Sequence, residues 1–170
     1  MIVVSILTGV AASLAASGLF LWVLVHFKPK IEISQYIADI STDSDPRFAF
    51  KIINKTKSTI FDVKVQALLI NPVQVHGGPV NDVYELSLIK DDFFEMGPFD
   101  KKDKDAHYAL RFGTTDDLNS LWSQDTQYLR LNVVSRHAIS GFSNVASVIF
   151  NTKGIIKKGK HVFGEGMDVQ

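Results

Sequence analysis

The segment IFDVKVQALLI, residues 60–70, has the clearest strand pattern in the chain. Apolar and polar side chains alternate at period two, which is typical of a β-strand with one buried face. The expected inward positions are Phe61, Val63, Val65, Ala67 and Leu69, and the outward ones are Asp62, Lys64 and Gln66. Such a long run indicates a central strand of a β domain.

Shorter segments with the same alternation lie on both sides of this strand. They are residues 31–40, 48–53, 84–88, 108–112, 129–133, 146–150 and 155–163. Polar turns separate them, and we expect Asn71-Pro72 to end the long strand and residues 151–154 to close a hairpin. Residues 93–105 are interpreted as a connection, and Thr114 to Trp122 as a short helix with a capped start.

This series of short strands predicts a mainly β fold, an antiparallel immunoglobulin-like β-sandwich with one short helix. The chain is expected to divide into a transmembrane anchor at residues 1–28, the sandwich at 31–164 and a C-terminal tail at 165–170. The linker between anchor and sandwich is very short, so the domain should lie close to the membrane.

The anchor is predicted from residues 1–27, which contain no Asp, Glu, Lys or Arg. About 20 apolar residues suffice to cross the hydrocarbon core as a helix. A cleaved signal peptide is the alternative, but its basic n-region is missing and the apolar run is too long for it. We therefore expect a retained, single-pass helix in the cell (inner) membrane.

The orientation of the anchor follows from its flanking cations. Lys28 and Lys30 come directly after the span, and nothing basic except the α-amino group precedes it. The positive-inside rule then places the C-terminal domain in the cytoplasm. The absence of cysteine fits a reducing compartment.

Small residues recur every four positions along the anchor. They are Ser5, Gly9, Ser13 and Ser17. Residues four apart share a helix face, so this face can let another helix approach closely. We expect a helix–helix interface here, either in a homo-oligomer or with a partner membrane protein, although small residues are also common in membrane helices.

The order of features resembles the cytoplasmic immunoglobulin-like (E-set) domain of inward-rectifier potassium channels over residues 31–164. The residues that carry the resemblance are Arg47 to Ile52, residues 60–70, Leu121-Trp122, Ser140-Gly141, Val148 to Phe150, Ile155-Ile156 and Gly159. The resemblance implies an E-set sandwich, a cytoplasmic setting and assembly around a symmetry axis. It does not imply conduction, because a potassium pore needs two membrane helices and a filter loop, and the sequence has neither.

Composition and motifs argue against several function classes. The formal net charge is zero, whereas nucleic-acid binding requires a strongly basic face. The five histidines lack metal-ligand spacing, and no cysteine, phosphate-binding loop or nucleophile motif accompanies them. Ser135, His137 and Asp125 match a catalytic triad by residue type alone. We expect no enzyme activity, metal or cofactor.

A basic set of residues near the C-terminus raises the question of lipid contact. Candidate lipid-contacting residues are Lys28, Lys30, Lys157, Lys158 and Lys160. A solvated edge strand protected by lysines explains the last three equally well. His107 and His137 are expected at outward positions on strands.

Two functions remain open from the sequence. The first is a non-enzymatic interaction, adaptor or assembly module that self-associates through its membrane helix. The second is a bacterial membrane effector, defence or toxin-like, whose β domain senses a signal and whose clustered helices perturb the membrane. A ligand pocket in the sandwich would favour the second.

Overall fold

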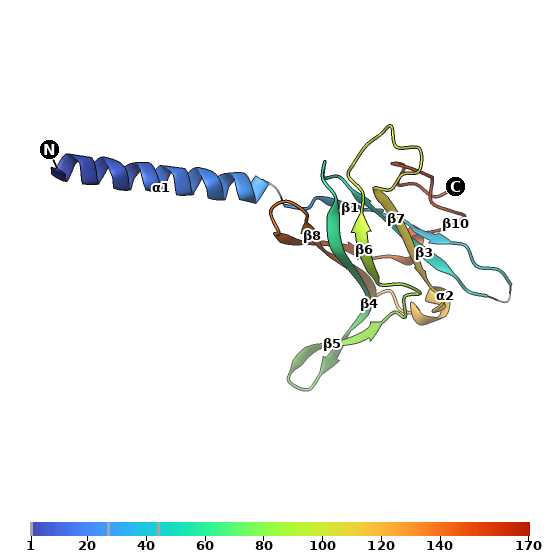
Figure 1. Cartoon of the computed structure of the whole chain (residues 1–170). Coiled ribbons are helices and arrows are strands. Elements are labelled where there is room, and N and C mark those ends of the chain that lie inside the picture. Colours follow the sequence, from blue (N-terminus) through green and yellow to red (C-terminus); the bar gives the residue numbers. More distant parts are fainter. Residues whose placement is uncertain (1, 27, 44) are drawn as a thin grey trace.

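The computed structural model describes residues 2–26, 28–43 and 45–170 and shows a long helix projecting from a β domain (Figure 1). The helix, α1, spans Ile2–His26. Its segment Ile2–Val25 has a mean hydropathy of 2.0, and none of it is buried against the protein. Length and composition therefore suffice for crossing a bilayer, as the sequence indicated.

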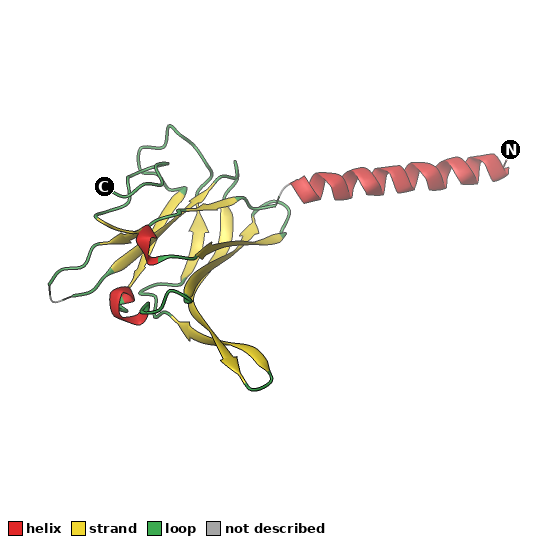
Figure 2. Cartoon of the chain, turned by 180° about the vertical axis from the view of Figure 1, so that it is seen from behind, coloured by secondary structure: helices red, strands yellow, loops and turns green. Residues whose placement is uncertain are grey.

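Two sheets make up the β domain (Figure 2). The strands of the first sheet are β1 Ile31–Ile33, β2 Ile37–Asp39, β3 Phe48–Asn54, β7 Ala109–Thr114 and β10 Ile156–Lys158. Those of the second are β4 Ile60–Val75, β5 Gly78–Glu85, β6 Asp92–Met96, β8 Tyr128–His137 and β9 Ser143–Phe150. The first sheet runs β1-β3-β2-β10 with β7 also on β3, and the second runs β5-β4-β8-β9 with β6 also on β4.

The core lies between the two sheets and confirms the period-two pattern. The side chains of β3, β4 and β8 that are buried in this core are Phe48, Phe50, Ile52, Ile60, Val63, Val65, Ala67, Leu69, Leu129, Leu131 and Val133. A short helix, α2, is present within the expected segment, but it spans only Leu118–Leu121, because Thr114 is the last residue of β7. The Asp117 side chain caps α2 by accepting from the Asn119 N–H. A mainly β, sandwich-like fold with an apolar N-terminal helix and one short α-helix in the domain is thus confirmed.

The inward assignment of Phe61 was wrong. The pairing of β4 with β8 shifts between Phe61 and Lys64, and Asp62 has a φ of 49°, as in a β-bulge. The extra residue turns Ile60 into the core, where it is 0% exposed. Phe61 lies on the other face and meets the ring of Phe94 edge-on, with centroids 5.8 Å apart.

Asn71-Pro72 does not end β4, contrary to expectation. The strand continues to Val75 and forms a hairpin with β5, in which Pro72 pairs with Asn81. Proline is tolerated because β8 pairs with β4 only as far as Ile70, so one edge is free beyond that point. The two strands project as an arm that leaves the sandwich, visible in green at the bottom of Figure 1.

Two other connections differ from expectation. Residues 93–105 contain β6, which pairs with β4 and buries Phe93 and Met96. Residues 151–154 do not close a hairpin but carry the chain to the other sheet through the 3₁₀ turn Lys153–Ile155. β10 then pairs with β2 in parallel, so the sandwich is not entirely antiparallel.

Residues 160–170 form a small hairpin on the outer face of the first sheet. The Lys160 N–H donates to the Gln170 carbonyl, and the Val162 N–H donates to the Asp168 carbonyl, at 2.7 and 2.9 Å. The expected boundary after residue 164 falls inside this hairpin, so residues 165–170 belong to the domain. The hairpin covers Lys51, which is 0% exposed although it points away from the core.

Candidate ligand-binding pocket

The predicted helix–helix interface lies apart from the sandwich. Ser5, Gly9, Ser13 and Ser17 are exposed on α1. An added Cβ at Gly9 would meet no atom within 4 Å, so the face is open to another helix. Association through this face stays a prediction.

The five candidate lipid-contacting lysines are not brought together. Lys28 and Lys30 follow α1 directly, whereas β10 lies on the side of the domain away from it (Figure 1). Lys157 Nζ lies 3.3 Å from the Tyr36 ring centroid, and Lys158 Nζ donates to the Ser41 carbonyl at 3.0 Å. The position of β10 and the contacts of Lys157 and Lys158 therefore give no support to lipid contact on that side of the domain.

The outward assignment of His137 was wrong, and His161 is also buried. Their exposed fractions are 1% and 4%. His107 is exposed as expected, but it lies in the turn before β7 and not on a strand. Asp125 lies before the start of β8 and His137 at its end, so about 30 Å of strand separates them. Ser135, His137 and Asp125 therefore do not form a triad.

An acidic cluster in the loop before β7 has an internal explanation. Asp103, Asp105 and His107 place potential ligand atoms within 4.8 Å of one another. The Asp103 carboxylate already accepts the backbone N–H groups of Asp105 and His107 at 3.0 and 2.8 Å. These bonds hold the loop and lower the pKa of Asp103, with His107 the first cause.

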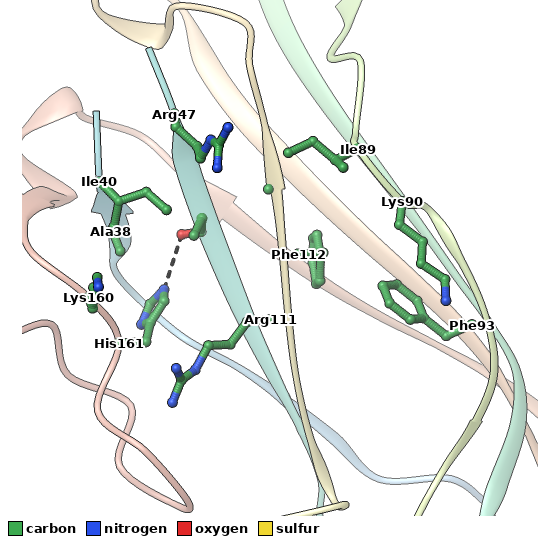
Figure 3. A pocket seen from close by; sticks show the side chains of 12 residues that line it. Ala38, Ile40, Arg47, Ile89, Lys90, Phe93, Arg111, Phe112, Lys160 and His161 are labelled. Carbon is green, nitrogen blue, oxygen red and sulfur yellow. Dashed lines mark hydrogen bonds between the residues drawn. The ribbon is translucent and has the colours of Figure 1, made fainter. Parts of the chain in front are cut away.

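A cavity of about 350 Å³ at β7, here called the β7 pocket, is the best-formed candidate site (Figure 3). Its size is at the lower end of the range for small-molecule sites. The lining residues are Ala38, Ile40, Arg47, Ala49, Ile89, Lys90, Phe93, Arg111, Phe112, Gly113, Lys160 and His161. They come from both sheets and from the segment that enters the C-terminal hairpin.

Apolar side chains form one wall of the β7 pocket. The rings of Phe93 and Phe112 lie with centroids 6.2 Å apart, and Ile89 lies on the same side in Figure 3. Gly113 lets β7 approach β3 closely, because an added Cβ would lie 2.6 Å from the Phe48 carbonyl oxygen. This wall suits the hydrocarbon part of a ligand.

Cations line the pocket without any carboxylate among its lining residues. They are Arg47, Lys90, Arg111 and Lys160. Within the described residues only Arg47 has a carboxylate partner, Asp45, at 2.9 Å. Lys90 Nζ lies 4.9 Å from the centroid of the Phe93 ring, at the border of the apolar wall.

The buried side chain of Lys51, behind the pocket, adds to the positive electrostatic potential of the pocket. Lys51 Nζ donates to the carbonyl oxygens of Val162, Gly164 and Gly166 at 2.6, 2.7 and 2.6 Å. Burial, together with the charges of Arg111 and Lys55, lowers the pKa of Lys51 to about 8. The lysine is therefore still charged at neutral pH.

His161 is the polar residue at the back of the pocket. Its Nε2 lies 3.1 Å from the Ala49 carbonyl, and its buried Nδ1 has no hydrogen-bond partner among the described residues. Burial, with the charges of Lys51 and Arg111, holds the pKa of His161 below its usual value. A bound anion would compensate these charges.

The polar side chains of the pocket lining are four cations and one histidine. The lining contains no hydroxyl, thiol or carboxylate that could act as a nucleophile or carboxylate base. Four cations next to an aromatic wall suit an anion with an apolar body. Sequence reasoning missed this site, because Arg47, Lys90 and Arg111 lie on three separate segments and no local motif links them.

Comparison with known proteins places this chain in no family. No protein-family model and no curated protein matches it. Among solved structures it is similar to Spo0M, a sporulation control protein from Bacillus subtilis, with a TM-score of 0.38 and 9% identity over 76% of this chain and 49% of that chain. It thus spans about half of the Spo0M structure.

A second similar structure is the Northeast Structural Genomics Consortium target SoR45. Its TM-score is 0.33, with 15% identity over 81% of this chain and 96% of that chain. Neither protein is an inward-rectifier domain. The resemblance of the sequence to the cytoplasmic domain of inward-rectifier potassium channels is therefore not tested by either comparison. At this level of similarity both comparisons concern the fold alone.

Proposed function

We propose that this protein is a membrane-anchored sensor whose β-sandwich binds an anion with an apolar body in the β7 pocket. The composition of the pocket lining carries the proposal. The lining holds four cations and no carboxylate, next to an apolar wall of Phe93, Phe112 and Ile89. Of the two functions open from the sequence, this pocket favours the sensing one. Association of anchors through the small-residue face is its proposed output.

The test compares two small probes that share an unbranched apolar tail and carry opposite charges. The full chain in phosphatidylcholine nanodiscs is titrated with hexanoate or hexylammonium, and binding is followed by saturation-transfer NMR. Hexanoate should bind and hexylammonium should not, because like charges repel at the pocket mouth. Equal binding of both probes, or of neither, would contradict the proposal.

A matched pair of variants locates the binding. Arg111→Met keeps an apolar stem but removes a cation from the pocket, and should weaken hexanoate binding about tenfold or more. Lys104→Met removes an exposed cation in another loop and should leave binding unchanged. Unfolding midpoints of both variants show whether the fold is intact.

An adaptor or assembly module is the second candidate, and the arm of β4 and β5 favours it. Val73, Val75, Val80 and Val83 are between 37 and 51% exposed on this arm. An isolated two-stranded hairpin is marginally stable in water, so a protein partner would stabilise it. Co-purification of a partner that is lost on removing these valines, without hexanoate binding, would favour this candidate.

A further inference from the structure

Two hydrogen bonds fix the sandwich to the chain that leaves α1. Asn144 Nδ2 donates to the Pro29 carbonyl at 2.9 Å, and the Lys30 N–H donates to Thr56 Oγ1 at 2.8 Å. The start of β9 and the turn at 55–59 therefore lie directly beside the exit of the helix. Figure 1 shows the orange loop between β8 and β9 at this place.

The tether between helix and sandwich is too short to let the domain move away. From His26 to Pro29 the chain can reach at most about 11 Å, even fully extended. The headgroup layer of one leaflet is about 5–7 Å thick. If α1 spans the bilayer, the end of the sandwich that carries these bonds lies at the headgroups or directly above them.

Two large apolar side chains point outward at this end. Ile139, in the loop between β8 and β9, is 72% exposed, and Phe94 on β6 is 77% exposed. A shallow depression lined by Phe94, Ala138 and Gly141 links β6 to this loop. Side chains of this kind lose contact with water when they enter the lipid interface.

The loop that carries Ile139 is held in place from inside the domain. The buried His137 ring accepts the N–H groups of Ile139 and Ser140 at its Nδ1, at 3.3 and 3.2 Å. The Ala138 N–H donates to the Thr59 carbonyl at 3.3 Å, which joins the loop to the neighbouring turn. Ile139 is thus presented on a fixed loop and does not fold back onto the sheet.

Cations lie on the two segments that adjoin the β8–β9 loop, which are the chain that leaves α1 and the turn at 55–59. Lys28, Lys30 and Lys57 are exposed, and no carboxylate of the described residues lies within salt-bridge distance of them. Juxtamembrane cations are attracted to anionic lipid headgroups. Apolar residues next to lysines are the composition of a surface that binds a membrane interface.

We propose that these five residues, Lys28, Lys30, Lys57, Phe94 and Ile139, form a membrane-facing rim that seats the sandwich on an anionic bilayer. Ile139 and Phe94 enter the interface, and the lysines contact the headgroups. The proposal goes beyond ligand binding in the β7 pocket and depends only on α1 spanning the bilayer. Within the β domain, the proposed lipid-contacting lysine is thus Lys57. The candidates named from the sequence were Lys157, Lys158 and Lys160.

The absence of cysteine allows a test with single labels. The variants Ile139→Cys, Val75→Cys and Val10→Cys of the full chain are labelled with an environment-sensitive fluorophore. Each is reconstituted in nanodiscs of phosphatidylcholine and phosphatidylglycerol, with or without brominated phosphatidylcholine as a quencher. Val75, at the tip of the arm, is the matched exposed position, and Val10 reports on the depth of α1.

Quenching at positions 139 and 10 but not at 75 is the expected result. In the Ile139→Cys background, Lys57→Glu should reduce quenching by at least about twofold in anionic discs and leave it unchanged in pure phosphatidylcholine. Quenching at position 10 with none at 139 would overturn the rim while leaving the anchor and the pocket intact. Loss of quenching at both positions would overturn the rim together with the membrane-spanning helix.

Discussion

At the scale of single residues, the outer face of the first sheet holds two buried bases, Lys51 and His161, that have no carboxylate partner among the described residues. The Lys51 ammonium donates to three backbone carbonyl oxygens, and the His161 Nε2 lies against the Ala49 carbonyl. Removing either partner of such a contact leaves a buried polar group unsatisfied. The stability of the outer face of the first sheet therefore depends on these two side chains.

The first prediction concerns the pH dependence of folding. Burial holds the pKa values of His137 and His161 below the usual value of 6.5. Below about pH 6.5 the unfolded chain takes up protons that the folded chain does not, so stability is full above this pH and falls as the pH decreases. The urea midpoint of the full chain should therefore be lower at pH 5.5 than at pH 7.5.

The variant His161→Gln should reduce this pH dependence, because one of the two histidines no longer titrates. His76→Gln, in the exposed turn of the arm, serves as the control and should keep the full dependence. An unchanged slope in His161→Gln would contradict the assignment of a buried, neutral imidazole at that position.

The second prediction concerns Lys51→Met. The substitution leaves the carbonyl oxygens of Val162, Gly164 and Gly166 without their donor, so the protein should lose about 1–3 kcal/mol of stability. Hydrogen exchange should accelerate in residues 160–170 before the rest of the sandwich. Lys101→Met, which removes an exposed ion pair with Glu165, should change stability by less than about 1 kcal/mol.

At the scale of elements, β4 connects most parts of the molecule. It pairs with β8, β5 and β6 along different segments, and the bulge at Asp62 separates the part beside the anchor from the core. The bulge turns Phe61 toward Phe94, and the extension past Ile70 forms the arm. A strand that the sequence predicted as a simple core element thus also positions the rim and the arm.

The third prediction concerns the small-residue face of α1. Gly9→Leu should reduce crosslinked oligomers in native membranes about fivefold or more, because a large side chain separates closely packed helices. Gly18→Leu is the matched control, since Gly18 lies nine residues away and about 180° around the helix.

Neither substitution meets an atom within 4 Å of the new Cβ, so neither should disturb the protomer itself. The same crosslinked species in both variants would show that association does not use this face. Loss of oligomers in both would indicate that the whole helix, rather than one face, is responsible.

At the scale of the whole molecule, the anchor and the β7 pocket lie at different ends of the sandwich. α1 leaves beside the end of β8, whereas the pocket lies at Gly113, which pairs with the start of β3. A ligand in the pocket would thus face the aqueous compartment, while the proposed rim would contact the bilayer. The proposed sensor would read a soluble anion on the side of the membrane that holds the domain.

The fourth prediction identifies that side. Because Lys28 and Lys30 follow the span, the domain should be cytoplasmic. A single cysteine at Lys104→Cys should react with a membrane-impermeant maleimide only after the cells are opened. A cysteine at Ile2→Cys should react in intact cells, and the reverse labelling pattern would show the opposite orientation.

Much of the architecture could be predicted because it rests on local patterns. The apolar run of α1 and the alternation in β3, β4 and β8 depend only on the identity of neighbouring residues. Deviations such as the bulge at Asp62 could not be predicted, since they depend on the register of a partner strand distant in the sequence.

The sequence by itself determined that a long apolar helix precedes a β-sandwich, because hydrophobic period and length are local properties. Only the tertiary structure decided which residues meet in space. It brought Arg47, Lys90, Arg111 and Lys160 around one pocket, and it placed the β8–β9 loop, which carries Ile139, beside the exit of α1. The physical reason is that strand pairing joins segments far apart in the chain, so convergent charges leave no pattern in the linear sequence.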